Sequence, residues 1–295
     1  MSANGTDTRV LNAFTVDVED YFQVSAFDGT VDRAGWDGFE RRVDRNTGTL
    51  LDLLASRQVK ATFFVLGWVA ERCPDLLRAL RDGGHEIASH GYEHRLVNGM
   101  HREAFRADLR RAADAIEAAC GVRVRGFRAP SFSIGEDSLW AFDVLREEGY
   151  EFSSSVFPVK HDRYGIPSFS RTPIRLLGAD GRSLWEFPMT TWRVLGRNLP
   201  VAGGGWLRFL PPSVMRRAFR KANAAGVPAV LYVHPWEVDP EQPRIAAPRM
   251  ARFRHYLNLS RTRGRLERLL DDFRWGTLSA AFADYAGRAP EASPA

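Results

Sequence analysis

The sequence has few of the features that stabilise secreted or membrane-embedded proteins. It contains only two cysteines, Cys73 and Cys120, which stand far apart and so argue against a disulfide framework or a cysteine-based zinc site. No apolar run approaches the roughly 18 uninterrupted residues of a transmembrane helix. The polar start, MSANGTDTRV, lacks the basic and then apolar stretches of a signal peptide. We therefore expect no transmembrane segment and a cytoplasmic location, either free or at the inner face of the membrane.

Lysine is also scarce. Only three of the 41 basic residues are lysines, so 38 arginines carry most of the net charge of +5. Many of them fall on predicted helix faces, where charge is usually just solvated. No helix-turn-helix, RRM or zinc-finger pattern accompanies the charge, so we expect no nucleic-acid partner. An anionic substrate or a membrane surface fits the charge equally well.

Strands and helices alternate along the 295 residues. Apolar runs predict strands at 10–16, 60–66, 86–89, 124–127, 150–156, 184–189 and 228–233. Helical spacing, proline starts and glycine stops predict helices at 49–58, 74–82, 102–119, 136–148, 212–225 and 263–273. This alternation predicts an α/β fold with a parallel sheet or barrel covered by helices. No linker divides the chain, so we expect one domain over 10–285, between disordered ends at 1–9 and 286–295.

The segment HEIASHGYEH at 85–94 contains two histidines at i and i+4, His90 and His94, just after a predicted strand. Two imidazoles at this spacing can bind one divalent ion if a carboxylate arrives from elsewhere and one position stays open. The spacing alone is weak evidence, because two histidines in a surface loop would look the same.

Other polar residues strengthen the case, because each follows or ends a predicted strand. They are the acidic cluster Asp17 to Asp20, Arg128, Glu186 and His234. In parallel α/β barrels the carboxyl ends of the strands build the active site, so these residues are expected to converge. The set suits metal-assisted hydrolysis. Asp17 would act as the base with Arg128 as its partner, and His234 as the acid, oriented by Glu186 or Glu237.

Apart from Glu186, these residues lie in motifs that resemble those of the polysaccharide deacetylases of the NodB-homology type, carbohydrate esterase family 4. The five motifs are FTVDVEDYFQV at 14–24, SHGYEH at 89–94, FRAPSFS at 127–133, YEFSSSVFP at 150–158 and VLYVHPWEVD at 230–239. The segments GGGW at 203–206 and FRHYLNL at 253–259 resemble the C-terminal extension, from about 157, of the exosortase-associated exopolysaccharide deacetylases.

The resemblance implies a distorted TIM-like (β/α) barrel that removes acetyl groups from an N-acetylated sugar. The sugar would belong to an exopolysaccharide or its lipid-linked precursor, and the biosynthesis machinery would be a partner. An aspartate and the two histidines of the second motif would bind a divalent metal. Zinc is the default, but cobalt, nickel, manganese or iron suits the same ligands. In this alignment Asp17 matches the base, Arg128 its partner and His234 the acid.

The chain departs from the family pattern in two motifs. Val18 follows Asp17 where the family has a second aspartate, so the metal carboxylate must be Asp20 or Glu19, and Asp20 is favoured. Ser153 replaces an aspartate in the fourth motif. We expect three further residues to contact the sugar: Tyr21, Pro130 and Trp236. Of these, Trp236 adjoins His234, the predicted acid.

Two other functions fit the sequence. The same barrel could hydrolyse a non-sugar amide such as a cyclic imide or ureide. Alternatively, the altered first and fourth motifs could belong to a catalytically inactive glycan-binding component of polysaccharide export.

Overall fold

A computed structural model describes residues 10–161 and 164–287. Its centre is one curved sheet in which seven strands lie parallel in the order β10-β1-β2-β3-β4-β5-β7. They are β1 (Leu11–Val18), β2 (Thr62–Val65), β3 (Glu86–Ser89), β4 (Gly126–Phe127), β5 (Phe152–Ser153), β7 (Ser183–Glu186) and β10 (Val230–Val233). The antiparallel strand β6 (Ile174–Leu177) extends one end, and β11 (Arg274–Gly276) pairs with the start of β1. The predicted mixed α/β domain is confirmed.

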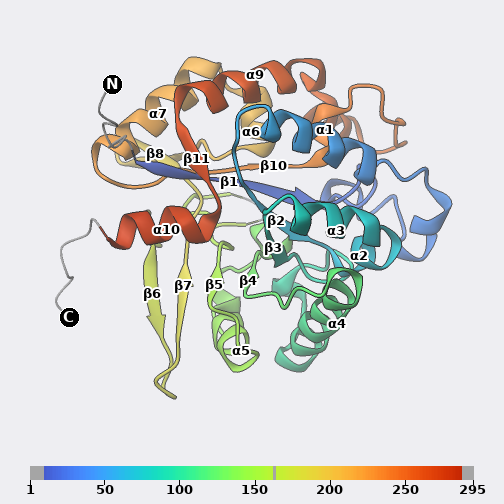
Figure 1. Cartoon of the computed structure of the whole chain (residues 1–295), viewed down its shortest axis with the longest axis horizontal. Helices are drawn as coiled ribbons and strands as arrows, with labels where there is room; N and C mark the ends of the chain where they lie inside the picture. The colour runs from blue at the N-terminus through green and yellow to red at the C-terminus, as the bar shows by residue number, and fades with distance from the viewer. Residues whose placement is uncertain (1–9, 162–163, 288–295) are drawn as a thin grey trace, which may run out of the picture.

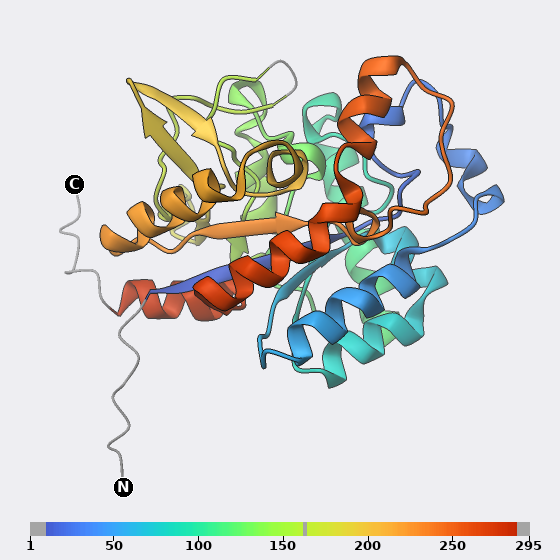
Figure 2. The same cartoon turned by 90° about the horizontal axis from the view of Figure 1, so that it is seen from above.

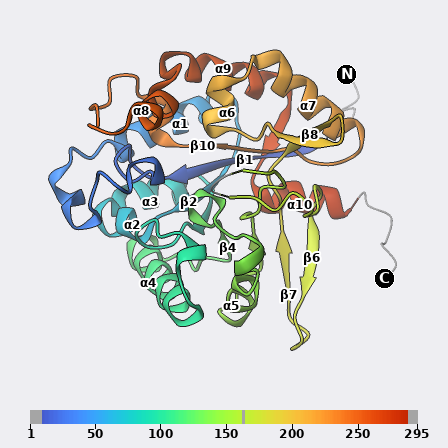
Figure 3. The same cartoon turned by 180° about the vertical axis from the view of Figure 1, so that it is seen from behind.

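Helices surround this sheet, as expected for strands such as β2 and β10 in which every residue is buried. In Figures 1 and 3, α7 and α9 lie on one side, α4 and α5 lie on the other, and α10 lies beside β6 and β7. The ten helices of the described residues are α1 (Val43–Ala55), α2 (Gly67–Arg72), α3 (Pro74–Asp82), α4 (Arg102–Cys120), α5 (Ala141–Glu147), α6 (Gly204–Phe209), α7 (Pro212–Ala224), α8 (Arg249–Tyr256), α9 (Leu259–Asp272) and α10 (Leu278–Ala286). None of the described helices is both long enough and apolar enough to cross a membrane.

Strand pairing within the described residues does not close the sheet into a ring. Side-chain contacts bridge the gap between the segment after β7 and the outer strand β10. The hydroxyl of Thr190 accepts a hydrogen bond from the Val230 N–H at 2.7 Å and donates one to the Val230 carbonyl at 3.1 Å. A two-stranded hairpin of β8 (Thr191–Val194) and β9 (Arg197–Pro200) follows, and Figure 2 shows it (yellow) far from α1 and α3. The architecture is therefore that of a distorted, incompletely hydrogen-bonded barrel.

Most predicted elements are present with shifted ends. Helix α1 begins at Val43 rather than Thr49, because the carboxylate of Asp20 accepts hydrogen bonds from the N–H groups of Arg42 and Val43 at 2.7 and 3.0 Å. A cap from so distant a residue cannot be read from local sequence. The helix predicted at 136–148 is a short 3-10 turn followed by α5, and the strand predicted at 150–156 is reduced to Phe152–Ser153.

The sequence did not predict several elements, namely α2, β6, the hairpin, α6, α8, β11 and α10. Helix α10 ends at Ala286, one residue beyond the predicted end of the domain at 285. Of the disordered ends predicted at 1–9 and 286–295, residues 1–9 and 288–295 lie outside the described residues. Cys73 and Cys120 are buried free thiols, each with a pKa raised by burial.

Candidate metal and catalytic site

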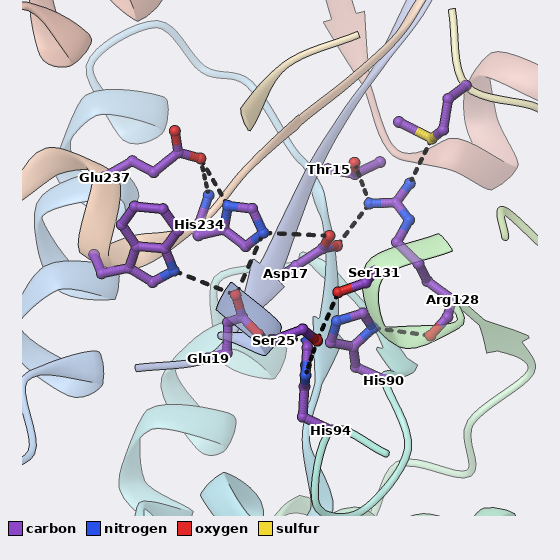
Figure 4. Close-up of polar contacts among 12 residues, drawn as sticks. Thr15, Asp17, Glu19, Ser25, His90, His94, Arg128, Ser131, His234 and Glu237 are labelled. Carbon is purple, nitrogen blue, oxygen red and sulfur yellow. Dashed lines mark hydrogen bonds and ion pairs between the residues drawn. The ribbon is translucent and has the colours of Figure 1, made fainter. Parts of the chain in front are cut away.

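The carboxyl ends of the parallel strands bring the predicted polar residues together (Figure 4). Asp17 is the second-last residue of β1, and Glu19 directly follows that strand. His90 follows β3, Arg128 follows β4, and His234 follows β10. These five residues come from four separate segments of the sequence, and hydrogen bonds or ion pairs link them within one cluster. The predicted convergence holds for these five residues, whereas Asp20 and Glu186 bind main-chain N–H groups instead.

Glu19, His90 and His94 form a group that suits a divalent metal. Their candidate ligand atoms all lie within 4.8 Å of one another, and all three side chains are buried. Oε2 of Glu19 lies 2.8 Å from Nε2 of His94, and no other donor among the described residues reaches it. A buried carboxylate oxygen without a donor is costly unless a cation or water satisfies it. Two imidazoles and a carboxylate are a common donor set for zinc and related ions, so these residues fit the predicted cofactor.

The two imidazoles are held so that their Nε2 atoms face this group. Nδ1 of His90 lies 2.8 Å from the carbonyl oxygen of Arg128, to which it donates in the neutral ring, leaving Nε2 unprotonated. Nδ1 of His94 lies 3.3 Å from Oγ of Ser25, which in turn contacts Oγ of Ser131 at 2.8 Å. Burial lowers the pKa of His90 to about 4, so the ring is neutral as metal ligation requires.

Asp20, which the sequence analysis favoured as the metal carboxylate, lies elsewhere. Besides capping α1, its carboxylate accepts a hydrogen bond from the N–H of Tyr21 at 2.9 Å. All its described partners are main-chain donors, and Glu19 stands beside the histidines instead. Glu19 and Asp17 both face Nε2 of His234, at 3.4 and 4.0 Å, whereas the carboxylate of Asp20 faces the start of α1. The preference for Asp20 is therefore corrected to Glu19.

Asp17 and Arg128 form a buried ion pair, as predicted. Nη1 of Arg128 donates to Oδ1 of Asp17 and to the hydroxyl of Thr15, both at 2.7 Å. The same guanidinium donates to the main-chain and side-chain oxygens of Ser154, both at 3.0 Å. Oδ2 of Asp17 faces Nε2 of His234 at 4.0 Å. Arg128 thus binds one oxygen of Asp17 and leaves the other directed into the site.

His234 is oriented by Glu237 and not by Glu186. Nδ1 of His234 lies 2.7 Å from Oε1 of Glu237, so Nε2 points toward Asp17 and Glu19. Burial lowers the pKa of His234, but Glu19 and Glu237 outweigh it and raise this pKa to about 9. Glu186 accepts hydrogen bonds from the N–H groups of Ser155 and Val156, both at 2.8 Å, and burial raises its pKa to about 7. Glu186 therefore does not orient His234, as one of the two predicted alternatives had it. It supports the loop after β5 instead.

The three residues expected to contact a sugar are buried. Tyr21 is 1% exposed and packs edge-on against Phe22 and Phe39. Pro130 is buried at the start of a 3-10 turn. Trp236 is 4% exposed, stacks with His234 and His255, and its Nε1–H lies 3.3 Å from Oε1 of Glu19. None of them presents a free face to a sugar ring, and Trp236 instead supports the carboxylate of the metal site.

Several residues of the site carried no signal in the sequence. Ser25 contacts His94, and Ser131 contacts Ser25, only because two loops meet there. Arg208 reaches Glu237 from α6, with Nε donating to Oε2 at 2.6 Å. One arginine among 38 has nothing local to distinguish it.

Comparison with known proteins divides the chain into two matched segments. Residues 30–152 match a family model described as polysaccharide deacetylase, and residues 154–283 match one described as a domain of unknown function (DUF3473). Asp17 and Glu19 precede both segments, His90, His94 and Arg128 lie in the first, and His234 and Glu237 lie in the second.

Individual relatives match over part of the chain. A chitooligosaccharide deacetylase from Sinorhizobium fredii is 37% identical over 100 residues, which cover 34% of this chain and 44% of that protein. One from Rhizobium leguminosarum bv. trifolii is 39% identical over 74 residues, covering 25% and 34%. A peptidoglycan-N-acetylglucosamine deacetylase from Bacillus cereus is 31% identical over 96 residues, covering 32% and 35%. The chain thus spans less than half the length of these curated relatives.

Solved structures match over nearly the whole chain at low identity. The crystal structure of a "putative polysaccharide deacetylase from Mycobacterium smegmatis" superposes with a TM-score of 0.65 at 23% identity, covering 99% of this chain and 96% of that one. Peptidoglycan deacetylase PdaC from Bacillus subtilis superposes with a TM-score of 0.51 at 14% identity, covering 95% and 94%. At these identities the likeness concerns the fold.

Proposed function

We propose that the chain is a metal-dependent hydrolase that removes acetyl groups from an N-acetylated sugar, because residues 30–152 match the model described as polysaccharide deacetylase. One observation carries the proposal: the buried group of Glu19, His90 and His94 lies beside a base candidate and an acid candidate. The deacetylase names of the partial relatives support the same reaction.

Glu19, His90 and His94 would hold the divalent ion. When bound, the ion supplies Lewis-acid chemistry, which polarises the amide carbonyl and makes water a stronger acid. Zinc suits this donor set best, although cobalt, nickel, manganese and iron use the same ligand types. The carbonyl of Arg128 keeps the proton of His90 on Nδ1, so that its Nε2 is free to bind.

Asp17 is the base in this proposal. Its Oδ1 is bound by Arg128, and its Oδ2 is directed toward the space beside Nε2 of His234. A water molecule in that space would lose a proton to Oδ2 as its oxygen bonds to the acetyl carbon. Because Nη1 of Arg128 holds Oδ1, Oδ2 keeps this direction.

His234 is the acid. Its Nδ1–H is donated to Glu237, so the transferable proton is the one on Nε2. With a pKa raised to about 9 by Glu19 and Glu237 against the effect of burial, the ring carries that proton at neutral pH. The proton passes to the sugar nitrogen as the C–N bond breaks, which releases acetate and a free amine.

We further propose that the sugar belongs to an exopolysaccharide or to its lipid-linked precursor, met at the cytoplasmic face of the membrane beside the biosynthesis machinery. The support is the resemblance of the segments at 203–206 and 253–259 to the extension of exopolysaccharide deacetylases.

The test measures bound metal by elemental analysis and acetate release from chitooligosaccharides on the same samples. Wild type should hold about one metal ion per chain and release acetate, and His90→Ala should lose both. His101→Asn is the matched control, because His101 is an exposed N-cap of α4 and asparagine caps helices well. Saccharide binding without metal or turnover would instead identify a glycan-binding protein.

A further inference from the structure

A chain of buried ion pairs continues beyond the site, from His234 through Glu237 to Arg208. Oε1 of Glu237 accepts from the main-chain N–H of His234 at 3.0 Å and contacts its Nδ1 at 2.7 Å. Oε2 of Glu237 accepts from Nε of Arg208 at 2.6 Å. Glu237 is 0% exposed and Arg208 is 2% exposed. The two carboxylate oxygens of Glu237 are therefore divided between the acid and a single arginine.

Arg208 is itself held on its far side by the end of a helix. Its Nη1 donates to the carbonyl oxygens of Arg254 at 3.1 Å, His255 at 2.6 Å and Leu257 at 3.0 Å. These carbonyls belong to the last turn of α8 and the residue that follows it. The last carbonyls of a helix lack helical partners and favour a cation. The guanidinium is thus fixed between this helix end and Glu237.

The helix that carries Arg208 is anchored on β10, the strand that directly precedes His234. The carbonyl of Ala202 accepts from the N–H of Tyr232 at 2.8 Å, and Gly203 forms a parallel bridge with Tyr232. Gly203 has φ +139, and a Cβ there would lie 1.9 Å from the carbonyl oxygen of Tyr232, so no other residue fits this approach. Helix α6 and the acid consequently share one scaffold, and their separation is set by main-chain contacts.

The electrostatics of Glu237 depend on Arg208. Burial alone would raise the pKa of this carboxyl, but Arg208 first and then His234 outweigh burial and lower it to about 2. Without the guanidinium, Oε2 would be a buried carboxylate oxygen with no described donor, and the carboxylate would be free to turn or to take a proton. Either change would release Nδ1 of His234.

We propose that Arg208 is a positioning residue for the acid: by binding Oε2 of Glu237, it keeps Oε1 on Nδ1 of His234 and so keeps Nε2 directed at the leaving nitrogen. This inference rests on the proposed function. It also assigns a role to the segment that matches a domain of unknown function, because Arg208, Glu237 and His234 all lie within 154–283. That segment would provide the acid with its supporting charges, while the polysaccharide deacetylase segment provides the histidine ligands.

The test compares two acetyl substrates that differ in their need for an acid. The amide of a chitooligosaccharide requires protonation of its leaving nitrogen, whereas 4-nitrophenyl acetate releases a stable phenolate without a proton. In the metal-loaded full chain, Arg208→Met should lower kcat for the amide by about 10- to 100-fold, within the range that a general acid supplies. We expect KM for the amide, metal content and kcat for the ester to stay within about threefold of wild type, and Arg208→Lys to recover part of the amide rate. The enzymatic rate of ester hydrolysis is taken as the part of the total rate that the Asp17→Asn substitution abolishes.

Arg265→Met is the matched control. Arg265 is also a buried arginine beside α6, donating to the carbonyls of Leu207 and Leu210, but it has no described contact with Glu237. Its loss should lower stability without a selective loss of amide turnover. Should Arg208→Met fail to fold, Glu237→Gln makes the same comparison, since it keeps the shape of the side chain.

Equal losses on amide and ester in the Arg208 variants, unchanged amide turnover, or a selective amide loss in Arg265→Met would each overturn the role of Arg208. A wild-type protein that holds metal but hydrolyses neither substrate would overturn the proposed function itself, and the role of Arg208 with it.

Discussion

The main-chain oxygen of Arg128 lies 2.8 Å from Nδ1 of His90, while its side chain binds Asp17 at 2.7 Å. One residue thus orients a candidate metal ligand with its backbone and the candidate base with its guanidinium. Arg128 is 0% exposed, and Cζ lies 4.1 Å from the ring centroid of Phe64, so packing fixes both contacts. The turn after β4 therefore fixes the position of the candidate metal ligand His90 relative to the candidate base Asp17.

Glu19 and Asp20 should respond differently to loss of charge. Glu19→Gln should weaken metal binding by more than about 100-fold. Even the loss of a residue that only hydrogen-bonds to a metal ligand lowers metal affinity by about 10- to 100-fold, and Glu19 is a candidate ligand itself. Asp20→Asn should retain the metal and lower the free energy of unfolding by about 1–3 kcal/mol, because buried main-chain donors lose their acceptor. Elemental analysis and urea denaturation of both variants check this, and metal loss in Asp20→Asn alone would restore the original preference for Asp20.

Asp17→Asn should lower kcat for acetate release by about 10²- to 10⁴-fold, the usual contribution of a general base. Bound metal should stay near the wild-type value, since Asp17 lies outside the ligand group. Activity and metal content are measured on the same folded sample, with circular dichroism as the check of folding. A variant that loses its metal together with its activity would make Asp17 a ligand and not the base.

Trp236→Phe tests whether this indole supports the metal carboxylate or contacts a sugar. The substitution keeps a buried ring but removes the Nε1–H that lies 3.3 Å from Glu19. Metal affinity should fall by about 10-fold or more, whereas KM for the saccharide should change little because the ring is 4% exposed. Competition with a chelator measures the affinity. A large rise in KM at unchanged metal affinity would favour the sugar contact instead.

Stability should fall in acid partly because of His255. Burial and then Arg208 lower the pKa of His255 from 6.5 to about 3, and its Nε2 lies 2.7 Å from Oε1 of Gln242. Between pH 6.5 and about 3 the unfolded chain binds a proton at this position and the folded chain does not, so the free energy of unfolding decreases as pH falls through this window. One such group contributes up to about 1.4 kcal/mol per pH unit.

His255→Asn should therefore flatten the dependence of unfolding free energy on pH between about 4 and 6.5, with the exposed-site variant His101→Asn as the control. Urea denaturation in the presence of a chelator measures both slopes without a contribution from metal release. Identical slopes for His255→Asn and wild type would show that His255 is protonated in the folded protein.

The local sequence was sufficient to identify the site residues that lie at strand ends. His90, Arg128 and His234 each directly follow an apolar run, and parallel strands with covering helices must bring their carboxyl ends to one edge. Asp17 was identified for the same reason. The alternation of strands and helices, and with it the mixed α/β fold, was readable because each element has its own periodicity and its own proline or glycine boundary.

Only the tertiary structure decided between neighbouring or equivalent carboxylates. Glu19 rather than Asp20 faces His94 because the start of α1 takes the carboxylate of Asp20 as its cap. Glu237 rather than Glu186 binds His234 because the turn after β10 folds back on itself, while Glu186 is occupied by main-chain donors. Arg208 joins the site from α6 through a contact 29 residues apart in sequence. Long-range capping and side-chain pairing leave no periodic pattern, so the sequence determined which strand ends form the site, and packing determined which charges meet there.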